Sequence, residues 1–320
     1  MTDKMVIVIT GVGDYWGARL AERLTQETGY HIIGIDNEPP PNGADGLDFI
    51  EADIDNPLVA ELLAREKVTV LCHLKFNERV KLDSANYERN VINTEKLLEA
   101  CTRAGVENVI LRSSTAVYGA HADNSAFLDE NSPLRGSRSF GHTRDLVDIE
   151  EFCEENQDRF EEVGLIIYRF ANIVGRDVDS PMTRFLRQKR PFVLFGFDPM
   201  IQFIHEDDVV EALAQGVMNP IPGVFNLGAD GAMPLTRVMR LVRKRPTPLF
   251  HQYAYKRFCK KSGLGFRRRR SQPIEWDYLR YPLVADLTKM RETLNFYPAY
   301  TAEEALRDFA GTRGKDEAVI

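Results

Sequence analysis

Apolar runs rich in β-branched residues recur through the first 170 residues of the chain. The first, Met5 to Thr10, reads MVIVIT, and similar runs follow at 31–36, 68–74, 108–114 and 165–170. Such runs are typical of parallel strands buried on both faces, because a strand with one solvated face alternates apolar and polar positions. Between them apolar residues recur at helical spacing, as in Trp16, Leu20 and Leu24 and over 90–104. This alternation predicts an α/β fold with a doubly wound parallel sheet, whose ligands bind at the carboxyl ends of the strands.

A glycine-rich turn joins the first predicted strand to the first helix. Gly11, Gly13 and Gly17 lie in this turn, and the second strand ends on Asp36. A strand, a tight turn and a helix leave N–H groups facing a pyrophosphate, while a carboxylate about 20 residues on accepts the ribose hydroxyls. Glycines alone are a weak signal, since any tight turn uses them. Together with the flanking strand, helix and acid, they predict a Rossmann-like dinucleotide site.

The residues around Asp36 favour NAD over NADP. A 2′-phosphate would be repelled by this carboxylate, and the next residues, Asn37, Glu38 and Pro39, include no arginine to receive it.

Later segments suggest a second, smaller lobe. Short strand candidates at 192–195, 201–203 and 224–227 are separated by Gly and Pro. We therefore assign residues 1–175, with 201–229 returning, to a dinucleotide-binding domain. Residues 176–200 and 230–320 form the predicted smaller C-terminal substrate-binding lobe. A chain of 320 residues is long enough for both.

The composition favours a cytoplasmic protein. The four cysteines (Cys72, Cys101, Cys153 and Cys259) are scattered and form no paired spacing, which favours a reducing compartment. No apolar stretch approaches membrane-spanning length, and the opening residues run straight into the first strand, so we expect no signal peptide. We also predict no metal site, because the acidic run His205 to Asp208 suits the start of a helix better than convergence on one ion.

The net charge of −7 conceals a basic segment. Residues 237–270 contain thirteen Lys or Arg and no Asp or Glu, with aromatic residues interleaved. Three interpretations stay open: a solvated surface, contact with a phosphate-bearing substrate or an anionic membrane surface, and nucleic acid. We consider nucleic acid the weakest, since the sequence contains no recognisable nucleic-acid module.

Several separated motifs resemble those of the extended short-chain dehydrogenase/reductases, in the NAD-dependent epimerase/dehydratase group. They occur in the family's order, from about residue 5 to 310: Thr10–Gly17, Asp53-Ile54, Cys72-His73-Leu74, Asn90-Val91, Ser113–Gly119 (SSTAVYG), Arg169–Asn172 with Gly175, and Phe203–Val209 (FIHEDDV). One motif is weak, but seven in order are specific.

The resemblance implies roles for particular residues. The cofactor is expected to contact Gly11, Gly13, Tyr15, Trp16, Gly17, Asp36, Asn37, Asp53, Ile54, Leu74, Lys75, Asn90, Arg144 and Phe170. The substrate is expected to contact Ser114, Thr115 and Asn172. The family also forms dimers through sheet-flanking helices, so the resemblance implies a homodimer.

The glycine turn departs from the family pattern. Asp14 stands where the middle glycine is expected, and a carboxylate there weakens pyrophosphate binding unless it turns to solvent or caps the helix. Lys75 replaces a small residue, and three roles are open to it: offsetting the charge of Asp14, contacting a phosphate, or facing solvent.

A second departure concerns the reaction itself. Phe140 and Arg144 stand at the positions of the family's catalytic tyrosine and lysine. Phe140 has no proton to give, whereas Arg144 can still hold ribose hydroxyls but stays protonated. Helical geometry turns His142 away from Phe140, so we expect it to face solvent. Ser114 and Arg144 are the remaining catalytic candidates.

Two functions therefore stay open. The first is a nicotinamide-dependent epimerase, dehydratase or reductase with an anionic, nucleotide-sugar-like substrate and non-standard or lost catalysis. The second is a non-catalytic nucleotide-binding sensor or scaffold, which docks on a membrane surface or a partner enzyme through residues 237–270.

Overall fold

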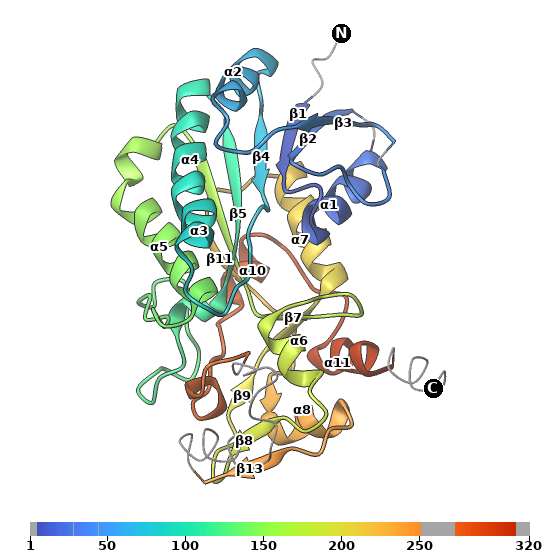
Figure 1. Cartoon of the computed structure of the whole chain (residues 1–320), viewed down its shortest axis with the longest axis vertical. Coiled ribbons are helices and arrows are strands. Elements are labelled where there is room, and N and C mark those ends of the chain that lie inside the picture. The colour runs from blue at the N-terminus through green and yellow to red at the C-terminus, as the bar shows by residue number, and fades with distance from the viewer. Residues whose placement is uncertain (1–4, 28, 44, 251–272, 312–320) are drawn as a thin grey trace.

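A seven-stranded parallel sheet forms the centre of the molecule in the computed structural model (Figure 1). The structure describes residues 5–27, 29–43, 45–250 and 273–311. The strands occur in the order β11-β6-β5-β4-β1-β2-β3. Their bounds are β1 (Met5–Thr10), β2 (Tyr30–Asp36), β3 (Leu47–Glu51), β4 (Val70–His73), β5 (Asn108–Ser114), β6 (Gly164–Phe170) and β11 (Gly223–Leu227). The order reverses between β1 and β4, where a doubly wound sheet opens its ligand crevice.

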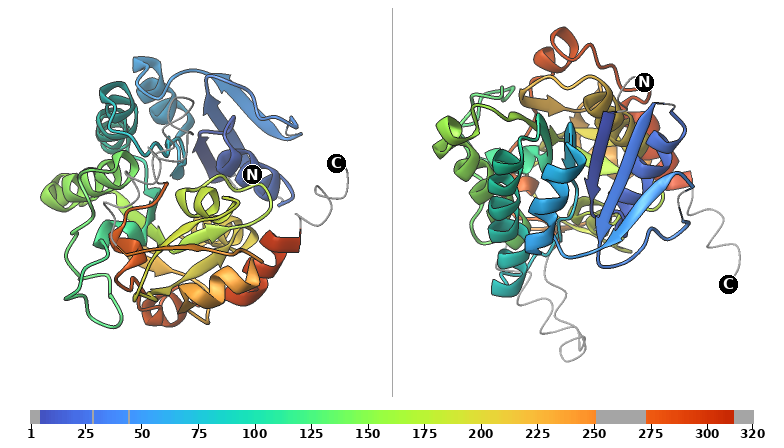
Figure 2. Two further views of the ribbon diagram at one scale, coloured as in Figure 1. Left: turned by 60° about the horizontal axis from the view of Figure 1, so that its bottom comes forward. Right: turned by 90° about the horizontal axis from the view of Figure 1, so that it is seen from above.

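Helices cover both faces of this sheet (Figure 2). On one face lie α1 (Tyr15–Thr25) and α7 (Glu206–Met218), whose buried side chains join one hydrophobic cluster with β1 and β6. On the other face lie α2 (Pro57–Glu66), α4 (Asn93–Ala104) and α5 (Gly141–Glu155), in a second cluster. Short helices α3 (Ser84–Tyr87) and α10 (Thr288–Glu292) complete this part, with α10 packed near β11. The predicted doubly wound α/β fold is confirmed.

The five predicted strands are confirmed, with shifts of one or two residues at their ends. The largest shift is at 68–74, where β4 covers Val70–His73. Strand β3 was not predicted, because its residues Leu47–Glu51 (LDFIE) alternate apolar and acidic positions at the sheet edge. The predicted helix at 90–104 begins within a π-helical turn, Glu88–Ile92, and continues as α4 from Asn93.

A third hydrophobic cluster lies below the sheet in Figure 1. It is built on three two-stranded pairs: β7 (Asn172–Val174) with β10 (Phe203–His205), β9 (Met200–Ile201) with β12 (Met233–Pro234), and β8 (Phe192–Leu194) with β13 (Thr247–Leu249). Helices α6 (Pro181–Leu186), α8 (Leu235–Leu241) and α11 (Ala302–Gly311) surround these pairs. The exact division into domains stays a prediction. Residues 251–270 of the basic segment lie outside the described residues.

Among the described residues, no helix combines the length and the apolar character that crossing a bilayer requires.

Candidate functional site

The glycine turn between β1 and α1 is closed by backbone packing. Gly11 adopts φ +82°, which favours glycine. A Cβ atom on Gly17 would lie 2.1 Å from the carbonyl oxygen of Gly11, so only glycine lets α1 approach the turn this closely. The helix starts at Tyr15, and its first N–H groups therefore lie directly after the turn.

The carboxylate of Asp36 is buried beside this turn and already accepts three hydrogen bonds. Its donors are the backbone N–H groups of Gly13 (2.9 Å) and Asn37 (2.7 Å) and the ammonium group of Lys75 (2.7 Å). The same ammonium lies 3.1 Å from Asp14. Burial opposes the charge of Lys75, but the hydrogen bond to Asp36 and the charge of Asp14 raise the pKa of Lys75. Of the three roles predicted for Lys75, the offsetting of Asp14 is confirmed.

Other predicted cofactor residues belong to the segments around this turn. The Tyr15 hydroxyl donates to Glu206, and the Trp16 ring is buried edge-on against Tyr15. Burial, then the bond to Glu206, raises the pKa of Tyr15. The Asn37 amide donates to exposed Asp53 at 3.3 Å. Ile54 and Leu74 are buried in the core behind them.

Two predicted cofactor residues are engaged elsewhere. The buried amide of Asn90 bonds the backbone of Asn77 and donates to Asp145 at 2.9 Å. The guanidinium of Arg144 donates to the same Asp145 carboxylate at 2.6 Å and stacks over Tyr87, with 4.5 Å from its Cζ atom to the ring centroid. Arg144 therefore holds a buried acid here, and its predicted contact with a ribose would require it to leave Asp145.

A cavity of about 80 Å³ lies at the carboxyl ends of β5 and β6. Its walls include three predicted site residues, Ser114, Phe170 and Asn172, and further residues from α5, α6 and the segment before η4 (Asp277–Leu279). The Ser114 hydroxyl accepts a hydrogen bond from the N–H of Ala116 at 3.2 Å, and the Asn172 amide donates to the Gln202 carbonyl at 3.0 Å. In the described part of the chain, Thr115 is buried in η2 (Thr115–Tyr118) and forms no part of the cavity wall.

The prediction that His142 faces solvent is wrong. Helix α5 begins at Gly141, with Phe140 in an extended conformation (φ −110°, ψ 122°) as its N-cap. The rotation of 100° per residue on which the prediction depended therefore does not apply across Phe140. The side chain of His142 lines the cavity instead, and burial lowers its pKa.

Two buried nitrogen atoms at the cavity residues have no hydrogen-bond partner among the described residues. One is Nδ1 of His142, and the other is Nε of Arg112 on β5. Arg112 is only 7% exposed and pairs with Glu78 through another nitrogen at 3.1 Å. Arg112 was not singled out from the sequence, because it occupies an ordinary strand position before the Ser113-Ser114 motif. His142 was singled out, but it was expected to face solvent.

A carboxyl group also lines the cavity, from a part of the chain far from the motifs. Glu275 lies opposite α5, and the Thr143 hydroxyl donates to its Oε1 atom over a long distance of 3.5 Å. Burial raises the pKa of Glu275 to about 7. Nearby, the Tyr278 hydroxyl donates to the carbonyl of Ala116 at 3.0 Å. The sequence offered no signal for Glu275, since it belongs to no periodic element.

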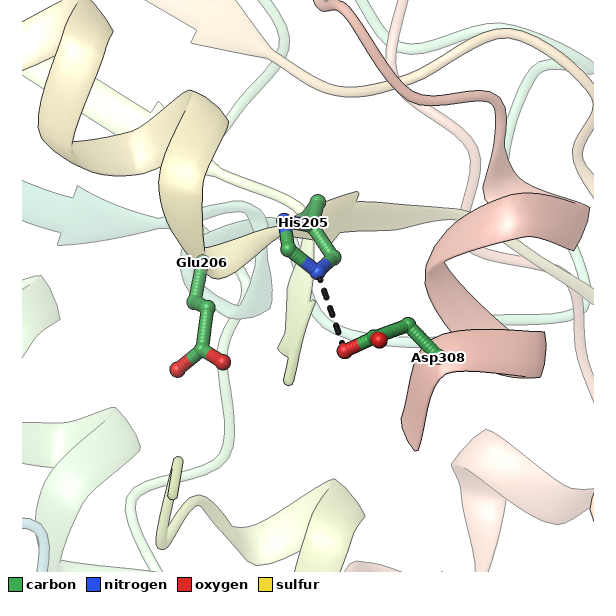
Figure 3. A group of neighbouring side chains, drawn as sticks. All are labelled: His205, Glu206 and Asp308. Atoms are coloured by element: carbon green, nitrogen blue, oxygen red, sulfur yellow. Dashed lines mark hydrogen bonds and ion pairs between the residues drawn. The ribbon is translucent and has the colours of Figure 1, made fainter. Parts of the chain in front are cut away.

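His205, Glu206 and Asp308 gather where α7 begins beside α11 (Figure 3). Each offers a ligand atom within 4.8 Å of the others, and Nε2 of His205 lies 3.5 Å from Asp308. The Glu206 carboxylate already accepts the Tyr15 hydroxyl and the N–H of Arg176, and the Arg176 guanidinium pairs with Asp308 at 2.9 Å. We therefore assign the cluster to protein contacts. The predicted capping role of this stretch is confirmed, since His205 accepts from the N–H of Asp207 as the N-cap of α7.

Comparison with known proteins connects this architecture to a family. The model of the NAD-dependent epimerase/dehydratase family matches residues 7–228. A protein of Mycobacterium tuberculosis that is itself uncharacterised is 29% identical over 97% of this chain and 84% of its own length.

Two solved structures share the fold over nearly their whole lengths. UDP-glucose 4-epimerase of Thermotoga maritima, solved with UDP-glucose, gives a TM-score of 0.72 at 20% identity, covering 98% of this chain and 100% of that one. The dTDP-glucose 4,6-dehydratase of Bacillus anthracis, solved with NAD, gives 0.71 at 17% identity, covering 98% of each chain. Since the family model spans more than half of the sequence, the chain belongs to the NAD-dependent epimerase/dehydratase family.

Proposed function

We propose that the protein binds a nicotinamide dinucleotide along the ends of β1, β2 and β4, and a nucleotide-sugar-type substrate in the cavity beyond β5. The observation that carries the proposal is that Ser114 and Asn172 line one cavity together with Arg112 and His142, and that each of the latter two has a buried nitrogen without a hydrogen-bond partner among the described residues. Buried polar atoms are nearly always hydrogen-bonded, so two unpartnered atoms among the described residues favour a polar ligand there. The permanent charge of Arg112 favours an anionic one.

The crevice fits the adenosine half of a dinucleotide after one rearrangement. The ribose hydroxyls would donate to Asp36, whose carboxylate now holds Lys75 at 2.7 Å. Lys75 has a flexible stem, so its ammonium would turn toward the phosphates as the ribose takes its place. Gly11, Gly13 and the first turn of α1 would then face the pyrophosphate. The nicotinamide, when bound, supplies an acceptor or donor of hydride.

The proposal extends to NAD in preference to NADP. The buried Asp36 carboxylate repels a 2′-phosphate. The Lys75 ammonium weakens this repulsion, which makes NADP the competitor to measure.

Catalysis, where it occurs, would not use the family's tyrosine. Phe140 stands at that position, and Arg144 is paired with Asp145. The same two residues support the second candidate, a nucleotide-binding sensor or scaffold without turnover. The sensor or scaffold would dock on a membrane surface or a partner enzyme through 237–270, and the proposal includes a homodimer.

Calorimetric titration tests the dinucleotide site. We expect NAD and NADH to bind in the micromolar range, NADP to bind more weakly, and Asp36→Asn to lose NAD binding. Asp48→Asn, an exposed carboxylate on β3, serves as the matched control. Absence of NAD binding to a folded wild-type protein would overturn the cofactor proposal.

Titration with UDP-glucose in the presence of NAD tests the substrate class. We expect binding that Arg112→Met abolishes, because the substitution removes the cation and the unpartnered Nε atom. Any turnover should fall sharply in Ser114→Ala with folding intact. UDP-glucose that binds without any turnover would favour the sensor.

A further inference from the structure

The cavity needs a group that exchanges protons if this protein performs hydride chemistry on a hydroxyl or carbonyl carbon. Phe140 has no such group, and Arg144 is held by Asp145. The Ser114 hydroxyl is a neutral group with an ordinary affinity for its proton, which makes it a poor base. The candidates for proton exchange are therefore the other ionisable groups of the cavity wall.

Three of these groups are poorly suited. Glu78 forms an ion pair with Arg112 at 3.1 Å. The Tyr278 hydroxyl is committed to the Ala116 carbonyl, and burial raises its pKa well above the usual value. His142 is a neutral hydrogen-bonding group, because burial lowers its pKa, and it is therefore a weaker base than an ordinary histidine.

Glu275 differs from all three. Among the described residues, no cation pairs with Glu275. Its neighbours are the hydroxyl groups of Ser137 and Thr143, the carboxylate of Asp277, which carries the same charge, and the phenol of Tyr278. A carboxyl group in this setting exchanges its proton near neutral pH, since burial raises its pKa to about 7. General acids and bases work best when their pKa lies near the working pH.

We propose that Glu275 is the acid–base group of the cavity and takes the place of the missing tyrosine, while Ser114 orients the same substrate oxygen. This inference rests on the proposed function, because it needs a substrate in the cavity and a nicotinamide beside it. It adds a catalytic residue that lies outside every family motif.

The step balances in both directions. When a substrate C–H bond breaks and its hydride reduces the oxidised nicotinamide, the hydroxyl O–H bond also breaks, its proton passes to the Glu275 carboxylate, and the C–O bond becomes C=O. In the return direction the hydride re-forms the C–H bond, and the Glu275 carboxylic acid returns its proton to the oxygen. Ser114 donates a hydrogen bond to that oxygen throughout.

The experiment compares wild-type protein, Glu275→Gln, Glu275→Asp and the control Glu154→Gln, an exposed carboxylate on α5. Calorimetry first measures the binding of NAD and UDP-glucose. Rapid-mixing absorbance then measures reduction of NAD from pH 5 to 9. Thermal unfolding at pH 5 and pH 8, without ligands, reports the protonation of Glu275 independently of activity.

We expect Glu275→Gln to bind both ligands normally but to reduce NAD about 10²–10⁴-fold more slowly. Its rate should lose the dependence on pH near 7, and Glu275→Asp should restore part of the rate. Without ligands, Glu275→Gln should unfold at a higher temperature than wild type at pH 8, and this difference should be much smaller at pH 5. The reason is that ionising a buried carboxyl destabilises only the wild type.

Three results would overturn the inference. One is an unchanged rate and pH profile in Glu275→Gln, which would leave the proposed function intact. Another is an equal difference in unfolding temperature at both pH values. The third is a wild-type protein that binds both ligands without reducing NAD. Failure of wild-type protein to bind NAD would instead reject the proposed function itself, and the inference with it.

Discussion

We expect the buried histidine His73 to contribute to the pH dependence of stability. His73 ends β4, and its ring nitrogens contact the Thr10 hydroxyl at 2.6 Å and the Thr94 hydroxyl at 2.9 Å. Burial, reinforced by the charge of Arg112, lowers the pKa of His73 to about 4. The folded protein therefore keeps this ring neutral under conditions in which the unfolded chain binds a proton.

The sign of the effect follows from proton binding. Between pH 6.5 and 4 the unfolded state binds the extra proton, so the free energy of unfolding falls as the pH is lowered through this window. The total loss from His73 is about 3 kcal/mol, since one pKa unit corresponds to about 1.4 kcal/mol. Urea unfolding at pH 7, 5.5 and 4 measures it. We expect His73→Gln to reduce the slope relative to wild type, whereas the more exposed His31→Gln should retain it.

Lys75 stabilises a carboxylate that cannot reach water. The Asp36 side chain is 1% exposed and that of Lys75 is 30% exposed. We expect Lys75→Met to lower the free energy of unfolding by about 1–3 kcal/mol, because it removes a charge-assisted hydrogen bond from a buried acceptor. Chemical unfolding at neutral pH measures the loss. Lys96→Met, exposed on α4, is the control, and an equal effect of both variants would contradict the assigned role.

At the scale of elements, the contact of α1 with the glycine turn fixes the crevice. We expect Gly17→Ala to destabilise the protein by about 1–3 kcal/mol or more, because the new methyl group overlaps the Gly11 carbonyl and α1 must move outward. Dinucleotide binding should fall with it. Thermal unfolding and calorimetry measure both effects. Gly311→Ala, where no atom of the described residues lies within 4 Å of the added Cβ, should change neither.

The elements also show how far the sequence predicts the structure. Strands buried on both faces have unambiguous apolar runs, so β1, β2, β4, β5 and β6 are predictable together with the turn and Asp36 that follow from them. Edge strand β3 has no such run. The orientation of His142 depends on a helix start one residue after Phe140, which local patterns locate only within a few residues.

Glu275 marks the limit of sequence-based prediction at this site. It reaches the cavity through tertiary packing against Thr143, which lies 132 residues earlier in the chain, and no local spacing encodes this approach. Family motifs identify the groups that the fold always brings together.

At the scale of the whole molecule, contacts with distant parts of the chain hold the segment around residues 278–285 in place. Leu128 pairs with Ala285 and Ile201 pairs with Leu283 in isolated β-bridges, and Tyr278 donates to Ala116 at the end of β5. These contacts place Glu275 over the cavity.

We expect Tyr278→Phe to weaken UDP-glucose binding about 5–10-fold, the equivalent of one hydrogen bond of about 1 kcal/mol, and to leave NAD binding unchanged. Calorimetry with each ligand measures the two affinities. Tyr281→Phe is the matched control, and equal weakening of NAD binding would show that the effect is not confined to the cavity.

The two unpartnered nitrogens of Arg112 and His142 have a consequence for the life of the protein in a cell. Each unpartnered nitrogen lowers the free energy of unfolding by about 1–3 kcal/mol where no group outside the described residues reaches it. The protein without its ligand is therefore less stable than a protein in which both atoms have partners. A ligand that satisfies both atoms adds to stability by mass action, and its supply then influences how much of the protein survives proteolysis. The amount of this protein would follow the availability of its own ligand.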